Sequence, residues 1–215
     1  MKKFFLISIL FYNSVSAQTI SNEDSIQTLG NVIVKAYEQN RGLIDVAAPV
    51  SVTSQAQLNR FSNMSILPAL NITPGVSMEE RSPGSYRLNI RGSSLRSPFG
   101  VRDVKIYLND IPLTDPSGNT YLNQLSFYNF NSIEIIKGPA SSLYGAGIGG
   151  AMLIHTLPTV WQQGVSAAYS MGSFNTNNMN VNVKTGDADH ENSFNYSHQT
   201  SDGYRQQAAM RRDIA

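Results

Sequence analysis

The sequence has 215 residues, of which 41% are hydrophobic and 14% are charged, so its composition is polar but compatible with a folded core. Lys and Arg number 16 against 15 Asp and Glu, and this balance gives no electrostatic basis for binding nucleic acid. The absence of cysteine excludes disulfides, thiol catalysis and thiolate metal sites. The histidines show no ligand spacing, and we expect neither a metal site nor a cofactor; they are His155, His190 and His198.

Residues 1–17 have the features of a secretory signal peptide. Two lysines precede an apolar run over residues 4–12, and the small residues at 15–17 predict cleavage before Gln18. A membrane anchor is the alternative, but this run is too short to span a bilayer, and no later segment offers the roughly 18 apolar residues of a transmembrane helix. We therefore predict export, after which a chain can still enter a membrane as a β-barrel.

A β-prone segment at residues 29–35 follows a polar stretch and contains Val32, Ile33 and Val34 in succession. Two interpretations are open. The segment is either the first core strand of a domain, or a strand that adds to the edge of a partner's sheet through backbone hydrogen bonds. Because such runs are common, the residues alone favour a core strand.

The next part of the chain predicts a strand and two short helices. Residues 48–53 read as the strand, and Ser54 with Gln57 fits a capping box at the start of the first helix. The second helix is expected over residues 65–71, and Pro74 with Gly75 ends it.

Loops then alternate with strands. Asn109 and Asp110 form a turn, since both residue types tolerate left-handed backbone. The expected strands are 87–90 and 104–108, and the expected loops are 81–85, 93–100 and 113–119.

Residues 132–156 combine strands with a cluster of glycines. Gly145, Gly147 and Gly150 satisfy the G-x-G-x-x-G spacing of dinucleotide sites, but a strand follows them where that fingerprint needs a helix. No Gly-Lys-Ser/Thr follows either, so a phosphate loop is excluded. The glycines indicate tight turning and close backbone approach. The expected elements are a strand over 132–137, a helix of one or two turns over 140–144 and a strand over 151–156.

This stretch resembles the end of the plug domain of TonB-dependent outer-membrane receptors. The family pattern contains IE, a basic residue, GP, S, LYG, GG and a final T, and the matching residues are Glu134, Lys137, Gly138, Pro139, Ser142, Tyr144, Gly145, Gly149, Gly150 and Thr156. Upstream, residues 67–76 resemble "LxxxPGV", residues 90–92 match "IRG", and residues 109–112 resemble the "DG-hydrophobic-P" turn with Asn-Asp in place of Asp-Gly. The resemblance runs from about residue 29 to residue 156.

The resemblance implies that a TonB box lies near residues 29–35, where TonB would bind by strand addition. The residues that would contact TonB are Leu29, Val32, Ile33 and Val34. Only residues 18–28 separate the box from the cleavage site, which disfavours the added N-terminal domains of signalling and glycan-import relatives.

The family also implies a lock between plug and barrel, in which plug cations pair with barrel glutamates. Arg91 and Lys137 hold these positions, and the lysine implies a weaker lock because it cannot make a bidentate pair. The partner glutamates would lie beyond residue 215. The three loops resemble the apices that touch ligand, although solvated loop charges are the alternative for each residue. The ligand-binding candidates are Arg81, Tyr86, Arg96, Asp115, Asn119 and Tyr121.

From Trp161 onward, apolar and small polar residues alternate with a period of two. Turn clusters at 175–178 and 186–189 divide strands of about 9 to 11 residues, the length of a tilted membrane-spanning strand. A soluble antiparallel sheet is the alternative. Plugged transporters need about 22 strands to close, so about three strands predict that the chain is a fragment or a truncated gene product.

The predicted fold class is an α+β plug domain, a small mixed sheet with short helices, followed by the start of a transmembrane antiparallel β-barrel. The predicted boundaries are 1–17 for the signal peptide, 18–40 for the N-terminal extension, 41–158 for the plug and 159–215 for the first barrel strands. The implied function is TonB-driven import of an extracellular ligand, most often a ferric siderophore, across the outer membrane of a Gram-negative bacterium. Cobalamin, haem and oligosaccharide are alternative ligands.

Two further hypotheses remain at this point. The chain could persist as a soluble periplasmic TonB-binding module that transports nothing. An enzymatic site would have to use Asp103, Asp110 and Asp115, but their places at strand ends favour turn-forming roles, so we predict no enzyme.

Overall fold

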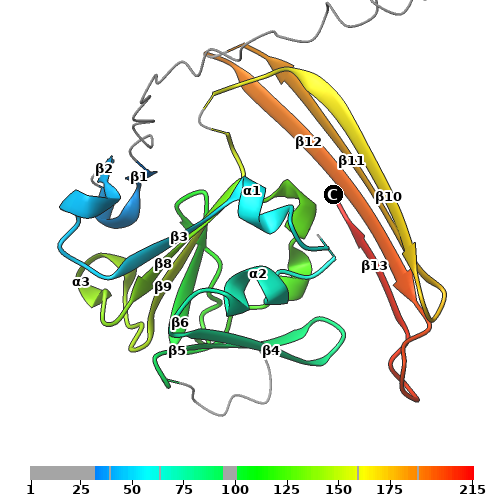
Figure 1. Cartoon of the computed structure of the whole chain (residues 1–215), viewed down its shortest axis with the longest axis horizontal. Coiled ribbons are helices and arrows are strands. Elements are labelled where there is room, and N and C mark those ends of the chain that lie inside the picture. Colours follow the sequence, from blue (N-terminus) through cyan, green and yellow to red (C-terminus); the bar gives the residue numbers. More distant parts are fainter. Residues whose placement is uncertain (1–31, 39, 63, 94–100, 159, 188) are drawn as a thin grey trace, which may run out of the picture. The chain divides into compact units, whose positions relative to one another are not determined.

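The computed structural model describes residues 32–38, 40–62, 64–93, 101–158, 160–187 and 189–215 (Figure 1). The signal-peptide prediction and Leu29 lie outside these residues. No helix in the described ranges is long and apolar enough to cross a membrane.

A five-stranded mixed sheet forms the centre of the first part of the chain (Figure 1). β6 and β9 are parallel, and the other neighbouring pairs are antiparallel. All six residues of β9 are buried, because elements cover both faces of the sheet. In spatial order the strands are β3 (Val50–Ser54), β8 (Ser132–Lys137), β9 (Gly150–His155), β6 (Val104–Leu108) and β7 (Ile111–Pro112).

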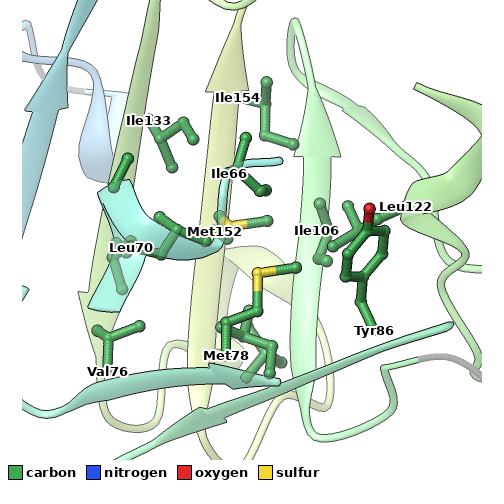
Figure 2. Packing of buried hydrophobic residues seen from close by; sticks show 14 of the residues in the cluster. Ile66, Leu70, Val76, Met78, Tyr86, Ile106, Leu122, Ile133, Met152 and Ile154 are labelled. Atoms are coloured by element: carbon green, nitrogen blue, oxygen red, sulfur yellow. The ribbon is translucent and has the colours of Figure 1, made fainter. Parts of the chain in front are cut away.

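Short helices and a hairpin cover one face of this sheet. Met152 and Ile154 of β9 point into the resulting core, where Leu70 and Met78 meet them (Figure 2). The burial of these apolar side chains away from water is the main source of stability for the domain. The covering elements are α1 (Gln55–Leu58), α2 (Leu67–Asn71), β4 (Val76–Ser82), β5 (Ser85–Ile90) and the 3₁₀ turns η3 (Leu122–Gln124) and η4 (Phe127–Asn129).

The N-terminal elements and the short helix at residues 141–144 cover the opposite face of the central sheet. Ala151 and Leu153 alternate along β9 with Met152 and Ile154, so they lie on the opposite face. There they pack against the fully buried Val34 and Ala36. The elements are β1 (Ile33–Val34), η1 (Ala36–Glu38), β2 (Arg41–Gly42), η2 (Leu43–Asp45) and α3 (Ser141–Tyr144). Alternate residues of β9 therefore point into two separate cores, one on each face of the sheet.

A second, antiparallel sheet holds the C-terminal strands in chain order. Asn178, Asn180 and Asn182 of β11 are buried, and their amides donate to Tyr128 Oη, Ser126 Oγ and Asn129 Oδ1 at 2.8, 3.5 and 3.2 Å. The alternate residues face outward, as Met179 shows with 43% exposure. The strands are β10 (Gly164–Gly172), β11 (Thr176–Gly186), β12 (Glu191–Ser201) and β13 (Met210–Ile214).

Local signals in the sequence predicted several elements closely. The predicted strand at 132–137 is confirmed, as is the capping box, in which Gln57 N donates to Ser54 Oγ and Ser54 N donates to Gln57 Oε1. Asn109 and Asp110 have the expected left-handed backbone, with φ of 47° and 69°. These features depend on residues that are close in sequence.

Two local predictions were wrong. Residues 81 and 82 were assigned to a loop but complete β4, which pairs with β5 across a bulge between Glu80 and Ser82. The predicted turn at 175–178 is shifted, because β11 already begins at Thr176 and its turn lies just before it. In both cases cross-strand pairing extended a strand into polar residues with weak β propensity.

Candidate ligand-facing site and N-terminal segment

A cavity of about 280 Å³ lies where the tip of the β4–β5 hairpin meets the ends of the C-terminal strands. The hairpin contributes Glu80, Ser82, Pro83 and Tyr86. The turn before β11 contributes Phe174, and the segment between β12 and β13 contributes Tyr204 and Arg205; Arg212 lines it from β13. Segments far apart in the sequence thus enclose one site that combines aromatic rings with guanidinium groups.

Tyr86 is the most buried aromatic side chain of this cavity, with 6% exposure. Burial first, and the nearby Glu80 carboxylate second, raise the pKa of Tyr86 to about 12, while Arg212 acts in the opposite direction. Its ring packs edge-on against Phe127, with centroids 5.8 Å apart. Tyr86 therefore presents a neutral hydroxyl, held in a fixed place, to anything that enters the cavity.

Two arginines from the C-terminal part of the chain line this cavity, Arg205 from the segment between β12 and β13 and Arg212 from β13. Arg205 Nη2 donates to the Arg81 carbonyl at 2.9 Å, and its guanidinium lies 4.8 Å from the Tyr204 ring centroid. Arg212 donates to the Asn123 carbonyl and to Gln199 Oε1, and it stacks over Phe127 at 5.7 Å. No acidic side chain pairs with either guanidinium among the ion pairs of the described residues.

A second hollow, of about 240 Å³, lies on the other side of the hairpin tip. Tyr86 lines both hollows, and Tyr121 joins it in the second, where it is 37% exposed. The structure therefore brings together two of the aromatic residues that the sequence proposed for ligand binding.

The other candidates are placed differently. Asp115 and Asn119 close their own turn, because Asn119 N donates to Asp115 Oδ1 and Asp115 N donates to the Asn119 carbonyl, both at 2.8 Å. Arg81 is exposed, and its side chain lines neither hollow. Arg96 lies outside the described residues.

Arg91 and Lys137 lie near each other at the far end of β5. Lys137 Nζ donates to the Pro74 carbonyl at 2.6 Å, and its pKa is lowered by desolvation and by the charge of Arg91. Arg91 has a left-handed φ of 53°. Two adjacent cations repel each other, so this place on the surface favours an approaching carboxylate.

The predicted TonB-binding residues divide into exposed and buried positions. Val32 and Ile33 are 49% and 64% exposed, whereas Val34 is fully buried. Ile33 and Val34 pair with Gly42 and Arg41 in the two-stranded β1–β2 sheet. Val34 would have to leave its place in the core before it could contact a partner.

The carboxylates considered for an enzymatic site do not converge. Asp110 lies in the left-handed turn after β6, and Asp115 closes the turn described above. No cluster of three or more His, Cys, Asp or Glu side chains with metal-binding geometry occurs in the part of the chain that the structure describes.

The family model described as "TonB-dependent Receptor Plug Domain" matches residues 42–151, which is about half of the chain. The chain belongs to this family. The matched span begins at the end of β2 and ends within β9, so it contains most of the central sheet and the layer of helices and hairpin on one of its faces.

Curated relatives of this TonB-dependent receptor include vitamin B12 transporters BtuB of Vibrio vulnificus. The protein of strain YJ016 is 25% identical over 211 residues, which cover 93% of this chain and 32% of the relative. That of strain CMCP6 is 22% identical over 171 residues, covering 78% of this chain and 27% of the relative. The chain thus spans about a third of the length of the curated relatives it matches.

Solved receptors share the fold. The ferric-catecholate import receptor Fiu from E. coli K12 superposes with a TM-score of 0.61 at 20% identity, over 80% of this chain and 24% of that one. The ferric yersiniabactin uptake receptor FyuA from Yersinia pestis gives a TM-score of 0.55 at 20% identity, over 72% of this chain and 24% of that one. At these identities the likeness concerns the fold alone.

Sequence reasoning about this TonB-dependent receptor missed Arg205, Arg212, Phe174 and Tyr204. Tyr204-Arg205 follows Gly203 in a segment without period-two alternation, and that break in pattern was the available signal. Arg212 shows no such signal, because its inward direction depends on the pairing of β13 with β12.

Proposed function

We propose that this chain supplies the plug and the first wall strands of an outer-membrane transporter that imports an anionic ferric chelate. The observation that carries the proposal is the cavity at the β4–β5 tip, where Arg205 and Arg212 stand beside Tyr86, Phe174 and Tyr204. Guanidinium groups suit carboxylate or catecholate oxygens, and the rings suit flat ligand groups. The ferric ligands named for Fiu and FyuA are consistent with this chemistry.

The proposed domain boundaries agree with this transporter function. Residues 1–17 direct export, residues 18–40 carry the coupling segment, residues 41–158 form the plug, and residues 159–215 enter the outer membrane. Support for the last assignment comes from the outer face of β10, where Val165, Tyr169 and Met171 are 74%, 60% and 74% exposed. Exposed apolar side chains in alternate positions suit a lipid environment.

Energy for transport would come from TonB, which adds a strand at residues 29–35 and pulls. Ile33 is exposed and lies in a two-residue strand, so little pairing has to be broken to free it. Arg91 and Lys137 would meet carboxylates of the barrel wall and hold the plug while ligand is absent.

Ligand chemistry can be tested with matched arginine variants. Arg205 lines the cavity, whereas Arg211, which is exposed, pairs with Asp213 at 3.7 Å. Cells that lack other receptors for the probe would be supplied with radiolabelled ferric citrate or a ferric tris-catecholate. Arg205→Ala should reduce uptake by at least about tenfold, because it removes a charged hydrogen bond to the ligand. Arg211→Ala should have little effect. Equal uptake by both variants and the parent would refute the anionic-chelate proposal.

Cobalamin is the second candidate, favoured by the BtuB relatives that match 93% and 78% of this chain. Labelled cyanocobalamin would be tested in the same cells. Uptake that saturates with cyanocobalamin and is insensitive to Arg205→Ala would select cobalamin over a ferric chelate.

Coupling to TonB can be tested by pull-down with a TonB C-terminal domain. Ile33→Pro removes a backbone donor and should abolish binding by strand addition, whereas Ile33→Ala keeps the donor and should bind. Binding that survives Ile33→Pro would place the coupling segment elsewhere. Outer-membrane fractionation distinguishes a transporter from a soluble periplasmic module.

A further inference from the structure

Three successive backbone amides, those of the last residue of the coupling segment (29–35) and of the two residues after it, are held by side chains of the plug. Lys35 N donates to Glu134 Oε1 and Oε2 at 2.9 and 3.0 Å, and Ala36 N donates to Glu134 Oε2 at 2.9 Å. Tyr37 N donates to Tyr144 Oη at 2.7 Å. Strand pairing between β1 and β2 ends at Val34, so side chains take over where the ladder stops.

Glu134 is an unusual acceptor, because it lies in the middle of β8 with 3% exposure. A buried carboxylate is costly unless hydrogen bonds replace its lost water, and the amides of residues 35 and 36 supply them. His155 Nε2 lies 3.5 Å from Glu134 Oε1 but makes no hydrogen bond within the described chain. Within the described residues, the hydrogen bonds to this carboxylate therefore come from the N-terminal segment.

Tyr144 fixes the other end of the segment. Its ring packs edge-on against Tyr37 and Tyr107, with centroids 5.9 and 5.3 Å apart, and it is 7% exposed. The ring contacts position the hydroxyl for the Tyr37 amide. Tyr107 belongs to the same cluster but does not accept from this amide, which makes it a matched control.

Resting on the proposed coupling role of residues 29–35, we propose that Glu134 and Tyr144 form a latch that holds residues 35–37 on the plug and must open before the plug is remodelled. Here "latch" means these two side chains and the amides of Lys35, Ala36 and Tyr37. Pulling on the preceding residues first loads the two-residue pairing of Ile33 and Val34 with β2, and these hydrogen bonds come next along the chain.

The latch has two arrangements that differ in the environment of one carboxylate. When it is closed, the amides solvate Glu134, and Val34 and Ala36 are fully buried. When it is open, a carboxylate in the middle of β8 loses its amide donors while the pairing of β8 with β3 and β9 is retained. That cost favours reclosure once tension ends, so the plug is reset without unfolding its central sheet.

These 215 residues contain no cysteine, so single-cysteine reporters can be placed in them without background from the plug. Val34→Cys reports opening because Val34 is fully buried, and Ile33→Cys, at a position 64% exposed, normalises for reagent access. Met152→Cys in the other core reports general unfolding. Maleimide labelling rates would be measured for each reporter in the full chain, in outer-membrane preparations.

Glu134→Gln should raise the labelling rate at position 34 about tenfold, because an amide side chain replaces a charged acceptor of the amide hydrogen bonds. Tyr144→Phe, which keeps the ring, should raise it about threefold, and Tyr107→Phe should leave it unchanged. Unchanged labelling in both latch variants would refute the proposal. An equal rise at position 152 would refute it as well, because Glu134 would then stabilise the whole plug.

A second measurement connects the latch to coupling. In the TonB pull-down, Glu134→Gln should increase the amount of TonB C-terminal domain retained, since more chains expose the segment. Faster labelling with unchanged TonB binding would refute the link to coupling. The labelling needs neither TonB nor ligand, so the latch can fail while the transport proposal stands, and the reverse also holds.

Discussion

Replacing Gly150 with alanine tests whether the glycine cluster exists for close backbone approach. Gly150 begins β9, pairs with Lys137 of β8 and has a left-handed φ of 134°. A Cβ atom there would lie 2.0 Å from the Ile136 carbonyl oxygen and 3.2 Å from the Gly138 nitrogen. Both neighbours are backbone atoms, one in β8 and one in the residue directly after it, so neither can rotate away.

The cost of this substitution has two parts. The backbone conformation costs a non-glycine residue about 1 to 3 kcal/mol, and overpacking against β8 adds about 1 to 3 kcal/mol, which gives an expected loss of about 4 kcal/mol. A loss of this size is a large fraction of the stability of an ordinary domain. We therefore expect Gly150→Ala to leave the plug largely unfolded or protease-sensitive.

Urea unfolding followed by circular dichroism, together with limited proteolysis, would measure the effect. Gly164→Ala is the matched control, because that glycine has neither a left-handed φ nor a heavy atom within 4 Å of its Cβ position. The control should change the free energy of unfolding by less than about 0.5 kcal/mol. If the two variants unfold within about 1 kcal/mol of each other, the close-approach explanation of the glycines is wrong.

Three further predictions follow from single side chains. Tyr86 should ionise near pH 12 in a spectrophotometric titration at alkaline pH. Since its pKa in the folded state lies above the ordinary tyrosine pKa of 10.0, its contribution to stability is complete below pH 10 and is lost between pH 10 and 12. An ionisation of Tyr86 near pH 10 would contradict its burial. Asn109→Ala should destabilise the plug by about 2 kcal/mol, because it removes the reciprocal hydrogen bonds with Thr156 and leaves an unfavourable φ, whereas Asn109→Gly should lose only the bonds. If thermal melts show the same loss of stability for both variants, the unfavourable φ does not contribute to the cost of Asn109→Ala. Ser54→Ala should cost about 1 kcal/mol in urea unfolding, and a cost near zero would mean that the capping box with Gln57 adds nothing to stability.

The sequence by itself determined the features that depend on neighbours in the chain. The bounds of β8, the capping box at Ser54 and the left-handed turn at Asn109-Asp110 all follow from residue types within a few positions. The family motif likewise occupies one continuous stretch, which made the fold class predictable. By contrast, the same local signals placed residues 81 and 82 in a loop, because they contain no information about the partner strand β5.

Only the tertiary structure decided what several of these residues do. In the sequence, Glu134 is a charge that interrupts a β-branched strand, yet in the fold it is buried and accepts hydrogen bonds from amides 98 and 99 residues away. Arg205 and Arg212 reach the β4–β5 hairpin only because β11, β12 and β13 pair in a fixed register. Burial and long-range pairing are properties of the packed chain, so no local pattern could show that Glu134 accepts from distant amides or that the two arginines line one cavity.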